Sequence, residues 1–209
     1  MSSEQRYKKI YKISIKHPKI KALIQPKLDW IRKQIIINKK TKILDAGCGN
    51  GRLQHYLEKV SDNVTGIDKS KYLVSQNKCK KTIIGSVLKL PFKNNAFDIT
   101  MCNCLLHHLK NPIKALKEME RVTKNYVIAI EPNKHNPFII LNSIKTKEKE
   151  LFKYDKKQVI RDHKNLKLVR TSTQGFISYK KVPCKLMRIL TKIEGEILGC
   201  FNITIWKVT

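Results

Sequence analysis

A glycine-rich stretch at residues 45–51, with the sequence DAGCGNG, constrains the fold of this chain more than any other feature. It follows the apolar run Lys42–Ala46, which predicts a strand. It precedes Arg52–Val60, where apolar residues recur at the i, i+3, i+4 and i+7 positions of a helix. Glycines at such a turn let the backbone approach a ligand that a Cβ atom would exclude. The sequence therefore predicts a ligand-binding turn within an α/β sheet.

Strands and helices are expected to alternate after this turn. Ser70 and Asn111, the latter followed by a proline, are expected to cap two of the helices. Strands that alternate with helices pair in parallel through right-handed crossovers. The chain is therefore predicted to be an α/β protein with a doubly wound, mostly parallel sheet. The further strands of this part are predicted from short apolar runs at Val64–Ile67, Thr82–Ile84, Asp98–Cys102 and Tyr126–Ile130.

The two ends of the chain have weaker patterns. Residues 1–40 alternate basic and apolar positions and predict a helical arm or lid, broken at Pro18 and Pro26. No repeat or Gly/Ser-rich linker interrupts the chain, so we expect one domain over 1–209. Its cofactor-binding core would be 41–132, and 133–209 would supply substrate-side helices and the last strands. These later elements are a helix near Asp155–His163 and strands near Lys167–Ser172 and Ile203–Val208.

The spacing of the glycines separates two kinds of cofactor. Dinucleotide-binding turns have the pattern GxGxxG, and its third glycine would fall on Arg52. This chain instead has GxGxG preceded by Asp45, whose carboxylate suits the ammonium group of an amino-acid moiety. The second strand leads to Asp68, where a carboxylate can accept hydrogen bonds from both hydroxyls of a ribose.

Three segments resemble class I methyltransferases that use S-adenosylmethionine (SAM). They are ILDAGCGNG at 43–51, GIDKS at 66–70, and GSVLKLPFKNNAFDITMCNCLLHHLKNPIKALKEMERV at 85–122. The resemblance extends from Ile43 to Pro132 and is strongest to the broad branch of ubiquinone-biosynthesis, sterol and other small-molecule methyltransferases. It implies a Rossmann-like fold with seven strands, of which the last is antiparallel. It also implies SAM as methyl donor and S-adenosylhomocysteine (SAH) as product.

The resemblance also implies which residues bind the cofactor. The glycines would hold the methionine part, Asp68 the ribose, and residues 85–87 the adenine. Ser86 departs from the family, which usually has an aspartate there, and a hydroxyl accepts the hydrogen bond of the adenine amino group more weakly. The residues at the end of the fourth strand would line the methyl side. The full predicted set is Asp45, Gly47, Cys48, Gly49, Asn50, Gly51, Asp68, Lys69, Gly85, Ser86, Val87, Cys102 and Asn103.

Two histidines, His107 and His108, follow the fourth strand, at the sheet edge where such folds bind substrates. An imidazole suits a general base when the acceptor keeps its proton until attack. His107 is therefore the candidate catalytic residue, while a packing or hydrogen-bonding role for one of the pair stays open. Residues 131–133, which follow the fifth strand, either touch substrate or only end the strand.

Several classes of site and protein are disfavoured. The six cysteines form no CxxC pair and match no histidine spacing, so we expect neither a metal site nor a disulfide framework. No apolar stretch approaches the ~20 residues that span a bilayer. The first sixteen residues lack the apolar segment of a secretion signal. We expect a cytoplasmic protein.

The net charge of +28 would draw the chain to polyanions such as RNA. Lysines outnumber arginines 37 to 7, however, and an AT-rich genome produces the same bias. A small-molecule or lipid-like methyl acceptor is the leading expectation, and tRNA or another RNA is the alternative. A non-catalytic SAM-binding subunit is the third. The lysines that an RNA would contact are Lys8, Lys9, Lys12, Lys16, Lys19 and Lys21, with Lys145, Lys147, Lys149, Lys153, Lys156 and Lys157.

Overall fold

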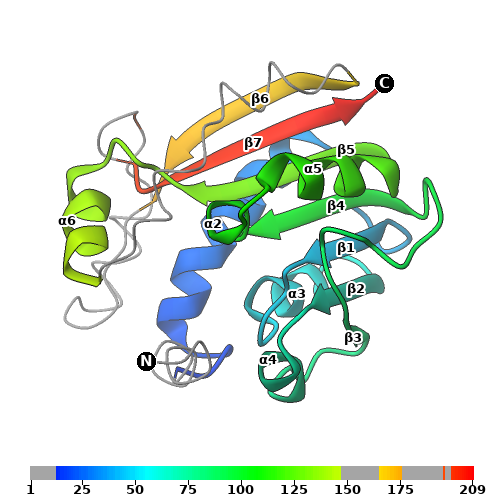
Figure 1. Ribbon diagram of the computed structural model, residues 1–209, viewed down its shortest axis with the longest axis horizontal. Coiled ribbons are helices and arrows are strands. Elements are labelled where there is room, and N and C mark those ends of the chain that lie inside the picture. Colours follow the sequence, from blue (N-terminus) through cyan, green and yellow to red (C-terminus); the bar gives the residue numbers. More distant parts are fainter. Residues whose placement is uncertain (1–12, 147–164, 176–194, 196–198) are drawn as a thin grey trace.

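A computed structural model describes residues 13–146, 165–175, 195 and 199–209 of the chain (Figure 1). In these residues one seven-stranded sheet has the order β3-β2-β1-β4-β5-β7-β6. Strands β1 to β5 pair in parallel, and β7 lies antiparallel between β5 and β6. The predicted fold class is therefore confirmed, including the antiparallel last strand. The strands are β1 (Lys42–Ala46), β2 (Asn63–Asp68), β3 (Thr82–Ile84), β4 (Phe97–Asn103), β5 (Thr123–Pro132), β6 (Leu166–Gln174) and β7 (Phe201–Val208).

Helix α2 (Pro18–Gln34) runs through a proline that was expected to break it. Pro18 begins the helix, where a proline is favoured, but the predicted break at Pro26 is wrong. An interior proline costs about 3 kcal/mol, whereas full burial of one Leu or Ile side chain contributes about 1.5–3 kcal/mol. The helix buries five such side chains against the sheet, so packing outweighs the proline. They are Ile20, Leu23, Ile24, Leu28 and Ile31.

Helices α4 and α5 begin at the predicted caps. Ser70 accepts a hydrogen bond from the Leu73 N–H at 3.2 Å and begins α4 (Lys71–Ser75). Asn111 accepts one from the Lys114 N–H at 2.9 Å and begins α5 (Pro112–Arg121). Helix α3 (Arg52–Leu57) ends three residues before the predicted Val60. Its chain tightens there, because the Val60 N–H bonds the carbonyl of Leu57, three residues back, at 3.0 Å.

Helix α6 (Pro137–Thr146) was not predicted. Its sequence, PFIILNSIKT, has apolar residues on several sides and lacks the periodicity that marks a helix covering a core. The helix predicted near Asp155–His163 lies outside the described residues.

Two apolar clusters form the core, one on each face of the sheet. Helices α2 and α3 contribute to the first, which also contains Phe201 of β7. Helix α5 contributes to the second, together with the 3-10 helix η1 (Leu106–His108). Since β1 to β5 run in one direction, the segments that follow them meet at one edge of the sheet, which we call the carboxyl edge. The predicted site residues belong to this edge.

Candidate functional site

The glycine loop, residues 47–51, joins β1 to α3 at the carboxyl edge. Gly47 and Gly51 have φ angles of +74° and +87°, which side chains of L-residues rarely allow. A Cβ on Gly47 would lie 2.6 Å from Cδ1 of Leu105, and one on Gly51 would lie 2.5 Å from Oδ1 of Asn77. The positive φ angles therefore favour glycine at both positions, and an added Cβ would also displace the ends of these two side chains.

Asp68 connects this loop to the end of β2. Its Oδ2 accepts a hydrogen bond from the Gly49 N–H at 2.9 Å, and its Oδ1 accepts one from the Ser70 N–H at 2.8 Å. The N–H groups of Gly47 and Cys48 bond the carbonyl of Ile67 at 2.8 and 3.0 Å. Each carboxylate oxygen has a further lone pair that a ribose hydroxyl could use. The ribose contact itself stays a prediction.

Two side-chain amides support the glycine loop, those of Asn77 and Gln54, and sequence reasoning missed both. Asn77 donates through Nδ2 to the carbonyl of Gly49 at 3.3 Å and to Oε1 of Gln54 at 3.0 Å. Gln54 is fully buried and donates to the carbonyl of Lys81 at 2.8 Å. Gln54 follows Leu53 on the buried side of α3, so a polar residue on an apolar helix face was an available signal. Asn77 lies 28 residues from Gly49 and has no local signal.

Asp45 is the most unusual group of the site. It is 1% exposed, and among the described residues its Oδ2 has no hydrogen-bond partner. Burial, and next the negative charge of Asp68, raise its pKa to about 8, against a smaller lowering by a hydrogen bond from the Gln54 backbone. An unsatisfied buried acceptor costs about 1–3 kcal/mol, and an ammonium donor would remove that cost. The site therefore fits a ligand that carries an ammonium group.

The remaining predicted cofactor residues differ in exposure. Cys48 and Asn50 are buried within the loop, and Lys69 is exposed after β2. Ser86 is exposed after β3, and its Oγ accepts a hydrogen bond from the Leu88 N–H at 3.2 Å. Val87 packs into the core. Gly85 lies against Ile67, whose Cδ1 would be 2.7 Å from an added Cβ.

At the end of β4, Cys102 is fully buried in the second core cluster. Its thiol thus contributes to packing, and only its backbone is left for the predicted ligand contact. Asn103 is half-buried, and the next residue, Cys104, has a φ of +54° that turns the chain away from the strand. The Cys104 N–H bonds the carbonyl of Ile130 at 2.8 Å, which fixes this turn to β5.

His107 is paired with Glu131, the penultimate residue of β5. Its Nδ1 lies 2.6 Å from Oε2 of Glu131, and the two side chains are 5% and 1% exposed. Oε1 of Glu131 accepts from the N–H groups of Leu105 and Leu106 at 2.9 and 2.8 Å. Glu131 accepts at both oxygens, so the imidazole carries its hydrogen on Nδ1, and Nε2 is left as the basic nitrogen. Of the roles left open for the two histidines, the structure shows a hydrogen bond for His107.

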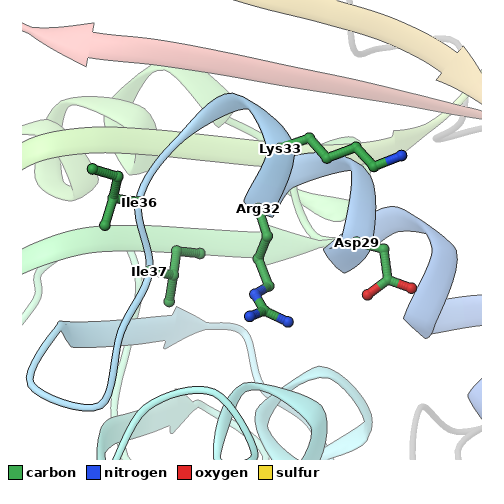
Figure 2. A pocket seen from close by; sticks show the side chains of 5 residues that line it. All are labelled: Asp29, Arg32, Lys33, Ile36 and Ile37. Atoms are coloured by element: carbon green, nitrogen blue, oxygen red, sulfur yellow. The ribbon is translucent and has the colours of Figure 1, made fainter.

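A pocket of about 640 Å³ lies elsewhere, near the end of α2 and ahead of β1 (Figure 2). Its lining residues precede β1, at the opposite end of that strand from the glycine loop. This pocket is therefore not the candidate site. It is lined by Asp29, Arg32, Lys33, Ile36 and Ile37.

Within the described part of the chain, no group of three His, Cys, Asp or Glu side chains is arranged to hold a metal ion. No helix in that part is both long and apolar enough to cross a membrane. Of the lysines expected to contact RNA, residues 8, 9, 12, 147, 149, 153, 156 and 157 lie outside it.

Comparison with known proteins gives a match to a family described as "Methyltransferase domain" over residues 44–130. An uncharacterized protein of Methanocaldococcus jannaschii is 35% identical over 104 residues, which are 49% of this chain and 45% of that protein. A demethylmenaquinone methyltransferase of Staphylococcus aureus is 32% identical over 139 residues, which are 59% of this chain and 57% of the relative. The chain thus spans 45% and 57% of the lengths of these two relatives.

The solved structure of a SAM-dependent methyltransferase from Aquifex aeolicus has the same fold, with a TM-score of 0.67 at 16% identity. The alignment covers 100% of both chains. The glycine loop lies within residues 44–130, the part of the chain that matches the methyltransferase domain family, and the chain has the fold of the Aquifex aeolicus methyltransferase.

Proposed function

We propose that this chain transfers the methyl group of SAM to a small-molecule or lipid-like acceptor. The observation that carries the proposal is the buried, unsatisfied carboxylate oxygen of Asp45 beside the glycine loop. When bound, SAM supplies a methyl group on a positively charged sulfur. A relative named for demethylmenaquinone, 32% identical over 139 residues, supports an acceptor of this class.

Different residues of the chain would bind different parts of the cofactor. Asp45 would accept hydrogen bonds from the ammonium, and the glycine loop would leave room for the methionine part. Asp68 would accept from the ribose hydroxyls, and Ser86 would accept from the adenine amino group between Gly85 and Val87. We infer that 41–132 is the cofactor-binding core and that 133–209 lies on the acceptor side.

His107 is our candidate for the base that removes the acceptor proton. The carboxylate of Glu131 would hold the ring with Nε2 as its basic nitrogen and would stabilise the charged imidazolium after proton transfer. Glu131 would then be a positioning residue. The hydrogen bonds that Glu131 accepts from the N–H groups of Leu105, Leu106 and His107 fix the backbone that carries the imidazole.

The proposal is tested by following a labelled methyl group. The protein is incubated with methyl-labelled SAM and with fractions of a cell extract that contain lipids, small polar metabolites or RNA. We expect label in the lipid or small-metabolite fraction and its loss on the change Asp45→Asn. Label in the RNA fraction alone would show that the acceptor is RNA, the alternative that the net charge of +28 favours. SAM binding without transfer to any fraction would favour a non-catalytic subunit.

The role of His107 is tested once the acceptor fraction is known. We expect His107→Gln to lower turnover by about 10²–10⁴-fold with little change in SAM affinity, because a base acts on the acceptor. Glu131→Gln should lower turnover less and shift its pH profile. The matched control is His108→Gln, since His108 is the exposed neighbour of His107, 3.9 Å away between ring centroids. A variant at His107 that unfolds, with normal turnover in the folded fraction, would show a packing role instead.

A further inference from the structure

Helix α6 has an apolar face that points to solvent. Phe138, Leu141 and Ile144 are 55%, 67% and 68% exposed. Spaced three residues apart, they lie on one side of the helix. On the other side, Ile139 and Ser143 are 5% and 4% exposed. The helix therefore turns most of its apolar surface outward, the reverse of a helix that covers a core.

Contacts at the start of α6 orient the helix against the rest of the protein. Ile139 packs into the first core cluster, which also contains Phe201. Asn136 caps the start of the helix, because its Oδ1 accepts from the N–H groups of Phe138 and Ile139 at 2.9 and 3.1 Å. The cap and the buried Ile139 fix which face is exposed. Contiguous exposed apolar side chains mark sites of interaction with a protein, a ligand or a membrane.

The net charge of the chain helps to distinguish three possible partners of this face: a second copy, RNA and an anionic lipid surface. The chain carries a net charge of +28, so a second copy would bring two strongly positive molecules together. The sequence from residue 145 to residue 157, which begins within α6, has six lysines and three acidic residues. RNA would neutralise the charge but would leave three exposed apolar side chains in water. An anionic lipid surface satisfies both features, since its headgroups attract lysines and its acyl region takes up apolar side chains.

We propose that the exposed face of α6 inserts into the surface of an anionic lipid bilayer. Helix α6 follows β5 and so lies toward the carboxyl edge, as Figure 1 shows. Docking there would bring the candidate site next to the bilayer. The inference goes beyond the proposed function, because lipid binding requires neither SAM nor methyl transfer.

The test is flotation of the protein with phosphatidylcholine vesicles that contain or lack phosphatidylglycerol. We expect binding only to the vesicles with phosphatidylglycerol. The double change Leu141→Ser with Ile144→Ser should weaken that binding by about tenfold or more, because two inserted side chains are lost. The matched control is Ile36→Ser, since Ile36 is 85% exposed and belongs to the pocket of Figure 2, far from α6 along the chain. This control should bind like the wild type.

Three results would overturn the docking proposal. The double variant could bind vesicles as well as the wild type, which would assign the binding to charge alone. The wild type could fail to bind phosphatidylglycerol vesicles. The wild type could also form a dimer that the double variant does not form, which would assign the face to a second copy. SAM calorimetry on each variant reports separately on the proposed function, so a failure there is distinguishable from a failure of lipid binding. Phe138→Ser repeats the test at a third position.

Discussion

Asp68 has an observed structural role and a predicted binding role. It accepts backbone hydrogen bonds from Gly49 and Ser70, and it is predicted to accept hydrogen bonds from ribose. Asp68→Asn keeps the shape of the side chain but removes its charge. We expect SAM and SAH to bind more weakly by roughly 1.5–3 kcal/mol, the scale of hydrogen bonds to charged groups. Calorimetry measures the loss.

A second aspartate serves as the control for Asp68. Asp62 is 57% exposed and bonds Lys39 at 3.1 Å, remote in sequence from the glycine loop. Asp62→Asn should leave both affinities unchanged. Equal SAM affinity in Asp68→Asn and the wild type would remove Asp68 from the ribose site.

Asp45 should make SAM binding depend on pH. With its pKa raised to about 8 by burial, Asp45 is mostly protonated at neutral pH in the free protein. An ammonium ligand favours the carboxylate, so binding should release a proton below pH 8. Affinity should therefore rise with pH from about 6 to about 8, by at most tenfold per pH unit. Calorimetry in buffers with different ionisation enthalpies counts the released protons.

The dependence should vanish when either charged partner is absent. Asp45→Asn cannot release a proton, so its SAM affinity should be weaker and flat with pH. Methylthioadenosine lacks the amino-acid moiety, so its binding to the wild type should also be flat. A similar slope for methylthioadenosine and SAM would place the titrating group elsewhere.

At the scale of elements, helix α2 carries a buried amine on its packed face. Lys27 is 2% exposed, donates to the carbonyl of Leu23 at 2.8 Å, and lies 3.5 Å from the ring centroid of Phe201. Burial lowers its pKa from 10.5 to about 7, against smaller raising effects of Cys104 and Cys200. Between these pH values the unfolded chain holds a proton that the folded protein releases, so stability should rise with pH in this window. Below about pH 7 both states are protonated, and the full cost of burial remains.

Lys27→Met should remove that cost. We expect the variant to be more stable than the wild type below about pH 7, by a few kcal/mol at most, since one pKa unit corresponds to about 1.4 kcal/mol. The gain should shrink as pH rises above 7. Urea unfolding at several pH values measures both. Lys33→Met, at an exposed position of the same helix, should change neither stability nor its pH dependence. A variant at Lys27 that is less stable than the wild type at every pH would contradict the prediction.

The elements that could be predicted from sequence are those with a local signature. Strand β1 was predicted with its observed bounds, and the caps at Ser70 and Asn111 were found, because apolar periodicity and capping residues act over a few positions. The break at Pro26 was wrong because the helix is stabilised by contacts with strands far along the chain.

Contacts across long sequence separations were not predictable in this way. Glu131 was singled out only as a residue that touches substrate or ends a strand. Its pairing with His107, 24 residues away, depends on the parallel register of β4 and β5. The hydrogen bond from Asn77 to the carbonyl of Gly49 likewise joins residues 28 positions apart. Helix α6 was missed because its outward apolar face breaks the pattern of a helix that packs on a core.

At the scale of the whole molecule, the net charge of +28 makes a prediction about RNA. If the lysines contact phosphates, affinity for tRNA should fall steeply and linearly with salt on logarithmic axes, because bound counterions are released. Changing Lys8, Lys9 and Lys12 together to Gln should then flatten the slope by about two or three. Filter binding over a series of salt concentrations measures the slope.

The opposite outcome would attribute the charge to genomic composition. RNA binding would then be weak at physiological salt, and the triple variant would resemble the wild type. A second triple variant controls for net charge alone. It changes three exposed lysines ahead of β1 to Gln, namely Lys33, Lys39 and Lys40. We expect the weak outcome, because arginine, whose planar guanidinium suits phosphate and base recognition, is scarce in this chain.

The position of β7 (Phe201–Val208) means that the sheet cannot be completed until the end of the chain has been synthesised. The strand is translated after β5 and β6, yet it lies between them and pairs with both. Until it emerges, the edge of β5 at Tyr126–Pro132 lacks the neighbour that later covers it, and such edges invite pairing with other chains. During synthesis the nascent chain therefore carries an open strand edge for some seventy residues of translation, a period in which a chaperone would protect it from aggregation.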